Sequence, residues 1–276
     1  MPENFLYDLV YAVISGFTGF FGVDASAHQR LFFLLTGRSQ VDLNLTLALR
    51  FGLLVALIFS CRSRLRRLMR ERALASRTRR LKRQPDLIAQ LDLKLIRTAM
   101  LPALVGVLLY AKGSAWINGF LLLSLTLLLN AVVLCIPRVV NSGNKDGRSV
   151  SPLDSLLLGV GSILGAFPGL SRMGCMLTAG AVCGLDRSYA LDMSLLLSVP
   201  ILLGLLVLDV LAVIAAQAAV GFVSMLLYLL YAALSAFFGW LSIVLMRFLS
   251  QKIGYAGFAY YSVGLALFSF VFYLVI

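Results

Sequence analysis

Long apolar stretches separated by short polar segments make up most of this chain. A helix needs about 20 apolar residues to cross a bilayer, because each residue adds about 1.5 Å. The stretches that we interpret as membrane spans are residues 43–60, 98–111, 119–136, 190–208, 210–227, 228–248 and 257–276. Together with shorter apolar segments, they predict an all-α, polytopic integral membrane protein with roughly eight spans.

Two shorter apolar segments are interrupted by loop-forming residues. In the first, residues 5–14 and 31–36 are apolar, and three glycines lie between them together with Asp24, Ser26 and His28. Each apolar part is too short to cross a membrane. The pattern therefore predicts a re-entrant helical hairpin, with the only histidine of the chain near its break.

The second interrupted segment lies between the apolar residues 153–167 and 175–184, and residues 168–174 read PGLSRMG. Pro168 cannot continue a helix, so this segment also predicts a re-entrant hairpin. An arginine at membrane depth, here Arg172, marks a functional site by default. Backbone N–H groups at a helix start bind anions, and arginine donors match phosphate oxygens. We interpret the segment as a buried phosphate site; the alternative is a proline-kinked helix whose arginine reaches the interface.

The two hairpins align with each other at an offset of 146 residues, which places Gly19 on Gly165. Interrupted apolar segments at matching places in two halves are typical of inverted repeats, whose binding sites lie between the halves. We therefore predict one transmembrane domain over residues 1–276, with one repeat at about 5–136 and the other at about 152–276. The alternative is two unrelated kinked helices.

Composition and charge support the membrane interpretation. The chain is 61% hydrophobic and 13% charged, whereas soluble domains are about 25% charged. Its net charge is +12, and residues 62–83 hold 11 Lys/Arg and one acid. Basic segments of this kind stay in the cytoplasm, so we predict a cytoplasmic basic loop at 62–97 and no nucleic-acid partner. The four cysteines form no CxxC pair, which argues against a disulfide framework or a zinc site.

One charged residue lies well away from the ends of its predicted span. Arg50 falls in the apolar stretch 43–60. A charge at this depth needs a partner, so we favour an internal ion pair, for example with Asp24 or Asp42, over the alternative that Arg50 binds a ligand directly.

The residues of both hairpins resemble a known family. Residues 168–174 are similar to the PGxSRSG motif of the undecaprenyl-diphosphate phosphatase (bacitracin-resistance) family, and residues 184–200 are similar to its G-x-x-R…FSFLLxxP segment. Residues 15–28 resemble its EGxTEFLPxSSxGH segment. The resemblance covers nearly the whole chain and is specific in these segments.

The resemblance implies a phosphatase of the bacterial plasma membrane that converts a polyprenyl diphosphate to the monophosphate, which recycles the lipid carrier of the cell wall. The two acidic residues of the first family motif fall on Ser15 and Gly19. These carboxylates are expected to hold a divalent ion or to act as a base, so a Mg²⁺ or Ca²⁺ cofactor is left open. We expect the lipid and the membrane as partners, and a homodimer is left open.

The candidate site residues come from both hairpins. The candidate catalytic residues are His28, Ser171 and Asp24, and Asp24 is the one acid that can replace the missing pair. The candidate substrate-binding residues are Arg172, Gly169, Gly174, Thr178 and Ser26. A second interpretation is a non-hydrolytic polyprenyl-phosphate binder or transporter, because a phosphate site without the family carboxylates suits transport better than cleavage.

Overall fold

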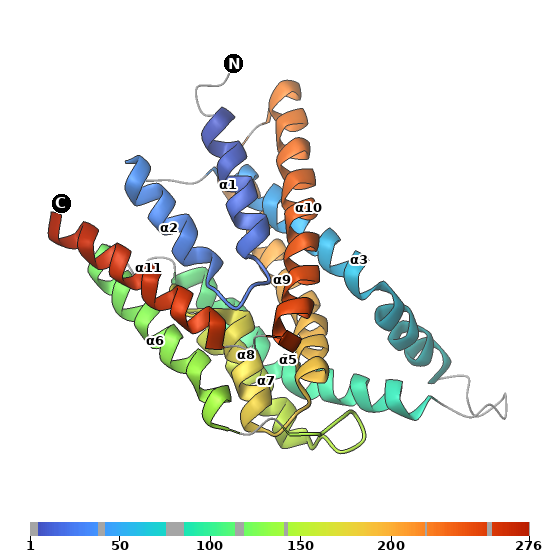
Figure 1. The fold of residues 1–276 in the computed structure, drawn as a ribbon. Helices are drawn as coiled ribbons and strands as arrows, with labels where there is room; N and C mark the ends of the chain where they lie inside the picture. Colours follow the sequence, from blue (N-terminus) through green and yellow to red (C-terminus); the bar gives the residue numbers. More distant parts are fainter. Residues whose placement is uncertain are drawn as a thin grey trace.

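A computed structural model describes residues 5–37, 42–75, 86–113, 119–140, 143–218, 220–252 and 256–275. Within these ranges the chain is all-helical, as predicted, and ten helices are present (Figure 1). The helices are α1 (Phe5–Thr18), α2 (Ala25–Thr36), α3 (Leu43–Ala75), α5 (Leu87–Gly113), α6 (Phe120–Val139), α7 (Pro152–Leu164), α8 (Arg172–Val182), α9 (Arg187–Ala215), α10 (Phe222–Lys252) and α11 (Ala256–Val275).

Six helices of the described residues are long and apolar enough to cross a membrane, namely α3, α5, α6, α9, α10 and α11. Large apolar side chains on their outer faces are exposed, for example Leu108, Val132 and Leu274. An exposed apolar surface of this extent is expected where lipid takes the place of water. The polytopic membrane architecture is therefore confirmed.

The prediction of three spans at 190–208, 210–227 and 228–248 is wrong, because two longer helices, α9 and α10, cover this part of the chain. The predicted break near Asp209 does not occur. Asp209 stays inside α9 because its carboxylate forms an ion pair with Arg50 of α3, and this partner compensates the charge within the helix bundle.

The basic segment is helical over most of its described residues. Residues 62–75 continue α3, α5 begins at Leu87, and residues 76–85 lie outside the described ranges. The basic end of α3 and the start of α5 extend together away from the other helices (Figure 1). An ion pair between Arg67 and Asp86, 2.6 Å long, joins them. The cytoplasmic location of this segment stays a prediction.

The two interrupted segments form two pairs of short helices, α1 with α2 and α7 with α8. Adding the offset of 146 to the last residue of α1, Thr18, gives Leu164, the last residue of α7. The pairs also pack in related ways, because α1 lies against α10 and α7 lies against α5. The matching helix ends support the internal repeat, whereas re-entry on one side of the membrane stays a prediction.

Glycines bring the long helices close together. A Cβ on Gly52 of α3 would lie 2.2 Å from the carbonyl oxygen of Ala232 on α10. A Cβ on Gly159 of α7 would lie 2.4 Å from the carbonyl oxygen of Ala99 on α5. Small residues at helix contacts are typical of membrane bundles, where close packing replaces the hydrophobic effect. These contacts bring α3 against α10, and α7 of the second short helix pair against α5.

Candidate active site

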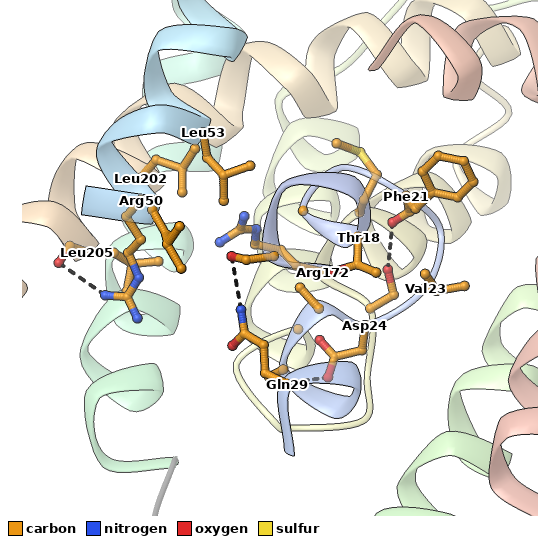
Figure 2. Close-up of a pocket in the computed structure, with 18 of the residues that line it drawn as sticks. Thr18, Phe21, Val23, Asp24, Gln29, Arg50, Leu53, Arg172, Leu202 and Leu205 are labelled. Atoms are coloured by element: carbon orange, nitrogen blue, oxygen red, sulfur yellow. Dashed lines mark hydrogen bonds between the residues drawn. The ribbon is translucent and has the colours of Figure 1, made fainter. Parts of the chain in front are cut away.

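The breaks of the two helix pairs meet at a cavity of about 90 Å³. Its lining includes Asp24, Ser26 and Gln29 from the first pair, Arg172 from the second pair, and Arg50 from α3 (Figure 2). The sequence therefore brings residues more than a hundred positions apart into one site. Four polar or charged groups that were predicted separately, Asp24, Ser26, Ser171 and Arg172, line this cavity.

Asp24 joins the two breaks. It is the N-cap of α2, and its Oδ2 accepts hydrogen bonds from the backbone N–H of Ala27 at 2.8 Å and from the hydroxyl of Ser26. The same oxygen accepts from the backbone N–H of Gly169 in the second break, at 2.7 Å. Asp24 is buried, so these donors replace the water that a carboxylate needs. Ser26 is thereby held with its hydroxyl on a carboxylate oxygen.

Ser171 holds the second break in place. Its hydroxyl accepts from the backbone N–H of Gly174 at 3.1 Å, as the N-cap of α8, and donates to the carbonyl oxygen of Phe21 at 3.2 Å. Its own N–H donates to Oδ1 of Asn130 on α6, at 2.9 Å. The hydroxyl proton of Ser171 is therefore used in a hydrogen bond to the first break. Thr178 lies further along α8, where it donates to the carbonyl oxygen of Val133 at 3.1 Å and does not line the cavity.

The backbone N–H groups of the second break are mostly used by the protein itself. Those of Gly169, Ser171 and Gly174 bond to side chains, and that of Leu170 bonds to the Phe167 carbonyl oxygen. Fewer backbone N–H groups than predicted are therefore free to bind an anion. Among the residues described, the backbone N–H groups of Arg172 and Met173, the first two residues of α8, make no hydrogen bond.

Arg172 is a cation of the cavity that the described residues leave available. Its guanidinium makes no hydrogen bond or ion pair with any described residue, and it lies in the cavity. The side chain extends from the second break toward Arg50 and Leu205, on the side away from Asp24 (Figure 2). Such a group provides donors in a fork that matches phosphate oxygens.

Arg50 is a second cation in the same cavity, but it is paired. Its Nη1 lies 2.5 Å from Oδ1 of Asp209 and 3.5 Å from the carbonyl oxygen of Leu205, and its guanidinium lies 5.2 Å from the ring centre of Tyr110. The expected internal ion pair is present. The predicted partners were wrong, because Asp42 instead accepts from the hydroxyl of Tyr228.

His28 lies behind the cavity wall and does not line the cavity. Its Nδ1–H donates to the carbonyl oxygen of Asp24 at 2.6 Å, because a carbonyl can only accept. Its Nε2 lies 2.7 Å from the hydroxyl of Tyr261, whose ring stacks on the imidazole at 5.7 Å. In the neutral ring Nε2 accepts from that hydroxyl. Both ring nitrogens are thus bonded to the protein.

Comparison with known proteins identifies the family of this chain. Residues 8–268 match the model of the family described as bacitracin resistance protein BacA. The chain belongs to the BacA family.

Individual relatives match over most of their length. An undecaprenyl-diphosphatase of Thermosipho melanesiensis is 27% identical over 265 residues, which are 96% of this chain and 98% of the relative. An undecaprenyl-diphosphatase of Methanobrevibacter smithii is 29% identical over 263 residues, 92% of each chain. An undecaprenyl-diphosphatase 1 of Shouchella clausii is 27% identical over 208 residues, 75% of this chain and 74% of the relative.

Two positions that are acidic in the motif EGxTEFLPxSSxGH are not acidic in this chain. Ser15 and Gly19, which stand where the family motif is acidic, both line the cavity. Ser15 accepts from the side-chain amide of Gln29 at 3.1 Å, and a Cβ on Gly19 would lie 2.7 Å from Cδ2 of Leu53. Within the described ranges no three His, Cys, Asp or Glu side chains come together. With Asp24 as the one carboxylate of the cavity, the donor set does not fit a protein-held Mg²⁺ or Ca²⁺.

Several residues of this site were not predicted from the sequence. Gln29 and Tyr110 line the cavity, Asn130 binds the second break, and Tyr261 bonds to His28. Asn130 has a sequence signal, since an amide in a long apolar helix needs a partner. It also donates to the hydroxyl of Ser262 at 3.0 Å. Gln29 and the tyrosines carry no such signal, because their roles depend on which helices meet.

Proposed function

We propose that this protein is a plasma-membrane phosphatase that hydrolyses undecaprenyl diphosphate, or a close polyprenyl diphosphate, to the monophosphate and inorganic phosphate. Membership of the BacA family over residues 8–268 and the activity after which its relatives are named support this function. The observation that carries it is the placement in one cavity of Arg172, which has no ion-pair partner among the described residues, and the Asp24–Ser26 hydrogen bond. The cell-wall lipid carrier would be recycled by this reaction.

The cavity recognises the phosphate end of the lipid. At about 90 Å³ it is smaller than the roughly 300–1,000 Å³ of sites that enclose a whole small molecule. The polyprenyl chain therefore stays outside, in the membrane. Arg172 binds the terminal phosphate, helped by the two N–H groups at the start of α8, and the charge of Arg50 adds a weaker attraction because Asp209 balances it.

The chemistry follows from the hydrogen bond between Ser26 and Asp24. Asp24 accepts the hydroxyl proton as Ser26 Oγ attacks the terminal phosphorus, and the bond from that phosphorus to the bridging oxygen breaks. The lipid monophosphate leaves with the proton that Asp24 accepted, which restores the Asp24 carboxylate. Water then attacks the phosphoserine, which releases inorganic phosphate and restores the Ser26 hydroxyl. Arg172 stabilises the charge on the transferred group throughout.

This assignment changes the roles expected from the sequence. Ser171 and His28 were candidate catalytic residues, but the Ser171 hydroxyl proton is donated to the carbonyl oxygen of Phe21, and His28 is bonded at both nitrogens outside the cavity. We therefore propose that Ser171 positions Arg172 at the start of α8, and that His28 orients the backbone at Asp24.

We also propose that diphosphate binding by this member does not need a divalent ion. The cavity holds one carboxylate, whose Oδ2 already accepts three hydrogen bonds, and two arginines. Arg172 and Arg50 therefore neutralise the phosphate in a cavity where positions 15 and 19, which are acidic in the family motif, carry no charge. The homodimer stays a prediction, which the mass of the detergent-solubilised protein measured by light scattering would test.

The test of function is phosphate release from a C55 isoprenyl diphosphate by the purified full-length protein. We expect release by the wild type, and labelled phosphate trapped on Ser26 after acid quenching. Ser26→Ala should lose both signals while it still binds the lipid. Tight lipid binding without any release by the wild type would refute the phosphatase and favour the carrier.

A further inference from the structure

A second polar cavity, of about 350 Å³, lies where the basic part of α3 meets the start of α9 and the end of α10. We call it the arginine cavity, and its lining includes Ser60 and Arg64 of α3, Asp192 of α9 and Arg247 of α10. Along α3, Arg64 lies 14 residues beyond Arg50, which is about 21 Å. The arginine cavity is therefore separate from the active site.

The arginine cavity has one positive charge in excess. Asp192 is shared between two cations, with its Oδ2 3.1 Å from Nη1 of Arg64 and its Oδ1 3.4 Å from Nη2 of Arg247. Each guanidinium has five N–H donors, so a single carboxylate satisfies only a small part of them. The remaining donors suit a second anion with several oxygens.

Two buried polar atoms in this cavity make no hydrogen bond with any residue that the structure describes. They are Nη1 of Arg64, whose contact with Asp192 lacks hydrogen-bond geometry, and Oγ of Ser60. Buried polar groups without partners are rare in folded proteins, and each one needs an explanation. Ligand oxygens in the arginine cavity would satisfy both atoms.

The surroundings of the cavity indicate where such a ligand comes from. Ile58 and Phe59 precede the cavity residues on α3, Phe248 follows Arg247 on α10, and all three side chains are exposed. The guanidinium of Arg62 lies 4.8 Å from the ring centre of Phe59. Exposed apolar residues that pass directly into a basic cluster are typical of the membrane interface, where anionic lipid head groups lie.

We propose that the arginine cavity binds the phosphate group of an anionic membrane lipid through Arg64 and Arg247. The acyl chains lie on the exposed apolar side chains of α3 and α10, and the volume of 350 Å³ is within the range of small-molecule sites. The site does not depend on the proposed phosphatase activity. It ties the protein to the leaflet that contains the basic end of α3.

The test is a titration of the full-length, delipidated protein with phosphatidylglycerol in detergent, read by native mass spectrometry. We expect one tightly bound phosphatidylglycerol and weaker binding of zwitterionic phosphatidylcholine. The double variant Arg64→Gln/Arg247→Gln should bind about 30-fold more weakly, from two charges at the interface. A double variant with the same charge change outside the cavity, Arg66→Gln/Arg70→Gln, should bind like the wild type.

The variant Asp192→Asn distinguishes two interpretations of the arginine cavity: a ligand site, or an ion pair that only holds helices together. It removes the competing carboxylate and keeps the shape of the side chain, so phosphatidylglycerol should bind several-fold more tightly. Weaker binding by Asp192→Asn, or wild-type binding by Arg64→Gln/Arg247→Gln, would overturn the proposal. Inorganic phosphate is the second ligand, and binding of phosphate without binding of phosphatidylglycerol would overturn a lipid as the occupant.

Discussion

The two arginines of the active-site cavity should respond to substitution with opposite effects on stability. Arg172 makes no ion pair with any described residue, whereas Arg50 is paired with Asp209 at 2.5 Å. Methionine keeps most of the apolar length of arginine and removes the charge. Arg172→Met therefore removes a charge that is costly to bury, and Arg50→Met leaves a carboxylate buried without its partner.

The expected magnitudes follow from burial. An arginine at the centre of a membrane helix costs at least ~2.5–3.5 kcal/mol, and the partly exposed Arg172 should cost less, so Arg172→Met should stabilise the protein by about 1–3 kcal/mol. Breaking a buried ion pair costs about 3–5 kcal/mol. The side chains of Arg50 and Asp209 are 17% and 15% exposed, so Arg50→Met should destabilise by about 3 kcal/mol, the low end of that range.

Thermal and denaturant-induced unfolding of both variants in detergent measures whether each substitution raises or lowers the free energy of unfolding. Lipid binding measures the functional cost of Arg172→Met. The variant loses two charge-assisted hydrogen bonds to phosphate, at about 1.5–3 kcal/mol each, so its affinity for the lipid should fall by about 10²- to 10⁴-fold. The reasoning fails if Arg172→Met unfolds as easily as Arg50→Met, since Arg172 would then have a stabilising partner. It also fails if Arg172→Met binds the C55 diphosphate normally.

Three further predictions concern the breaks and the cofactor. Gly169→Ala should destabilise by at least about 1–3 kcal/mol, because φ is +96° and the new Cβ would lie 2.0 Å from Oγ1 of Thr126; a normal melting temperature would contradict this. Asn130→Ala should cost about 1–3 kcal/mol in unfolding by leaving the N–H of Ser171 unpaired, whereas Ser262→Ala, which keeps that bond, should cost less. Lipid binding measured with EDTA should equal binding with Mg²⁺, and its loss in EDTA would show that a metal holds the phosphate.

The sequence predicts the parts of the fold that depend on local pattern. Apolar runs indicate an all-helical membrane protein, and the helix ends at Thr18 and Leu164 agree with the offset of 146. Hydropathy misplaced the break near Asp209, because it treats a charge as a helix end. The ion pair that keeps Asp209 inside α9 joins residues 159 positions apart, which no local pattern can reveal.

The sequence predicted which residues line the site better than it predicted the role of each residue. Asp24, Ser26 and Arg172 were singled out by polarity at a helix break, and all three line the cavity. The roles of Ser171 and His28 depend on contacts with other segments, such as the carbonyl oxygen of Phe21 and the hydroxyl of Tyr261. Such hydrogen bonds decide which polar groups remain for a substrate, and they form only when the helices have packed.

The central claim is that Asp24 provides the base and Arg172 the phosphate site, each from a different helix pair. Asp24→Asn tests it most directly, because asparagine keeps an oxygen that can cap α2 and accept from the N–H of Gly169. Phosphate release and binding of the C55 diphosphate should be measured side by side on this variant. We predict that release falls about 10²- to 10⁴-fold, the usual effect of a general base, while binding stays within a few-fold of the wild type. Release at the wild-type rate would contradict the account.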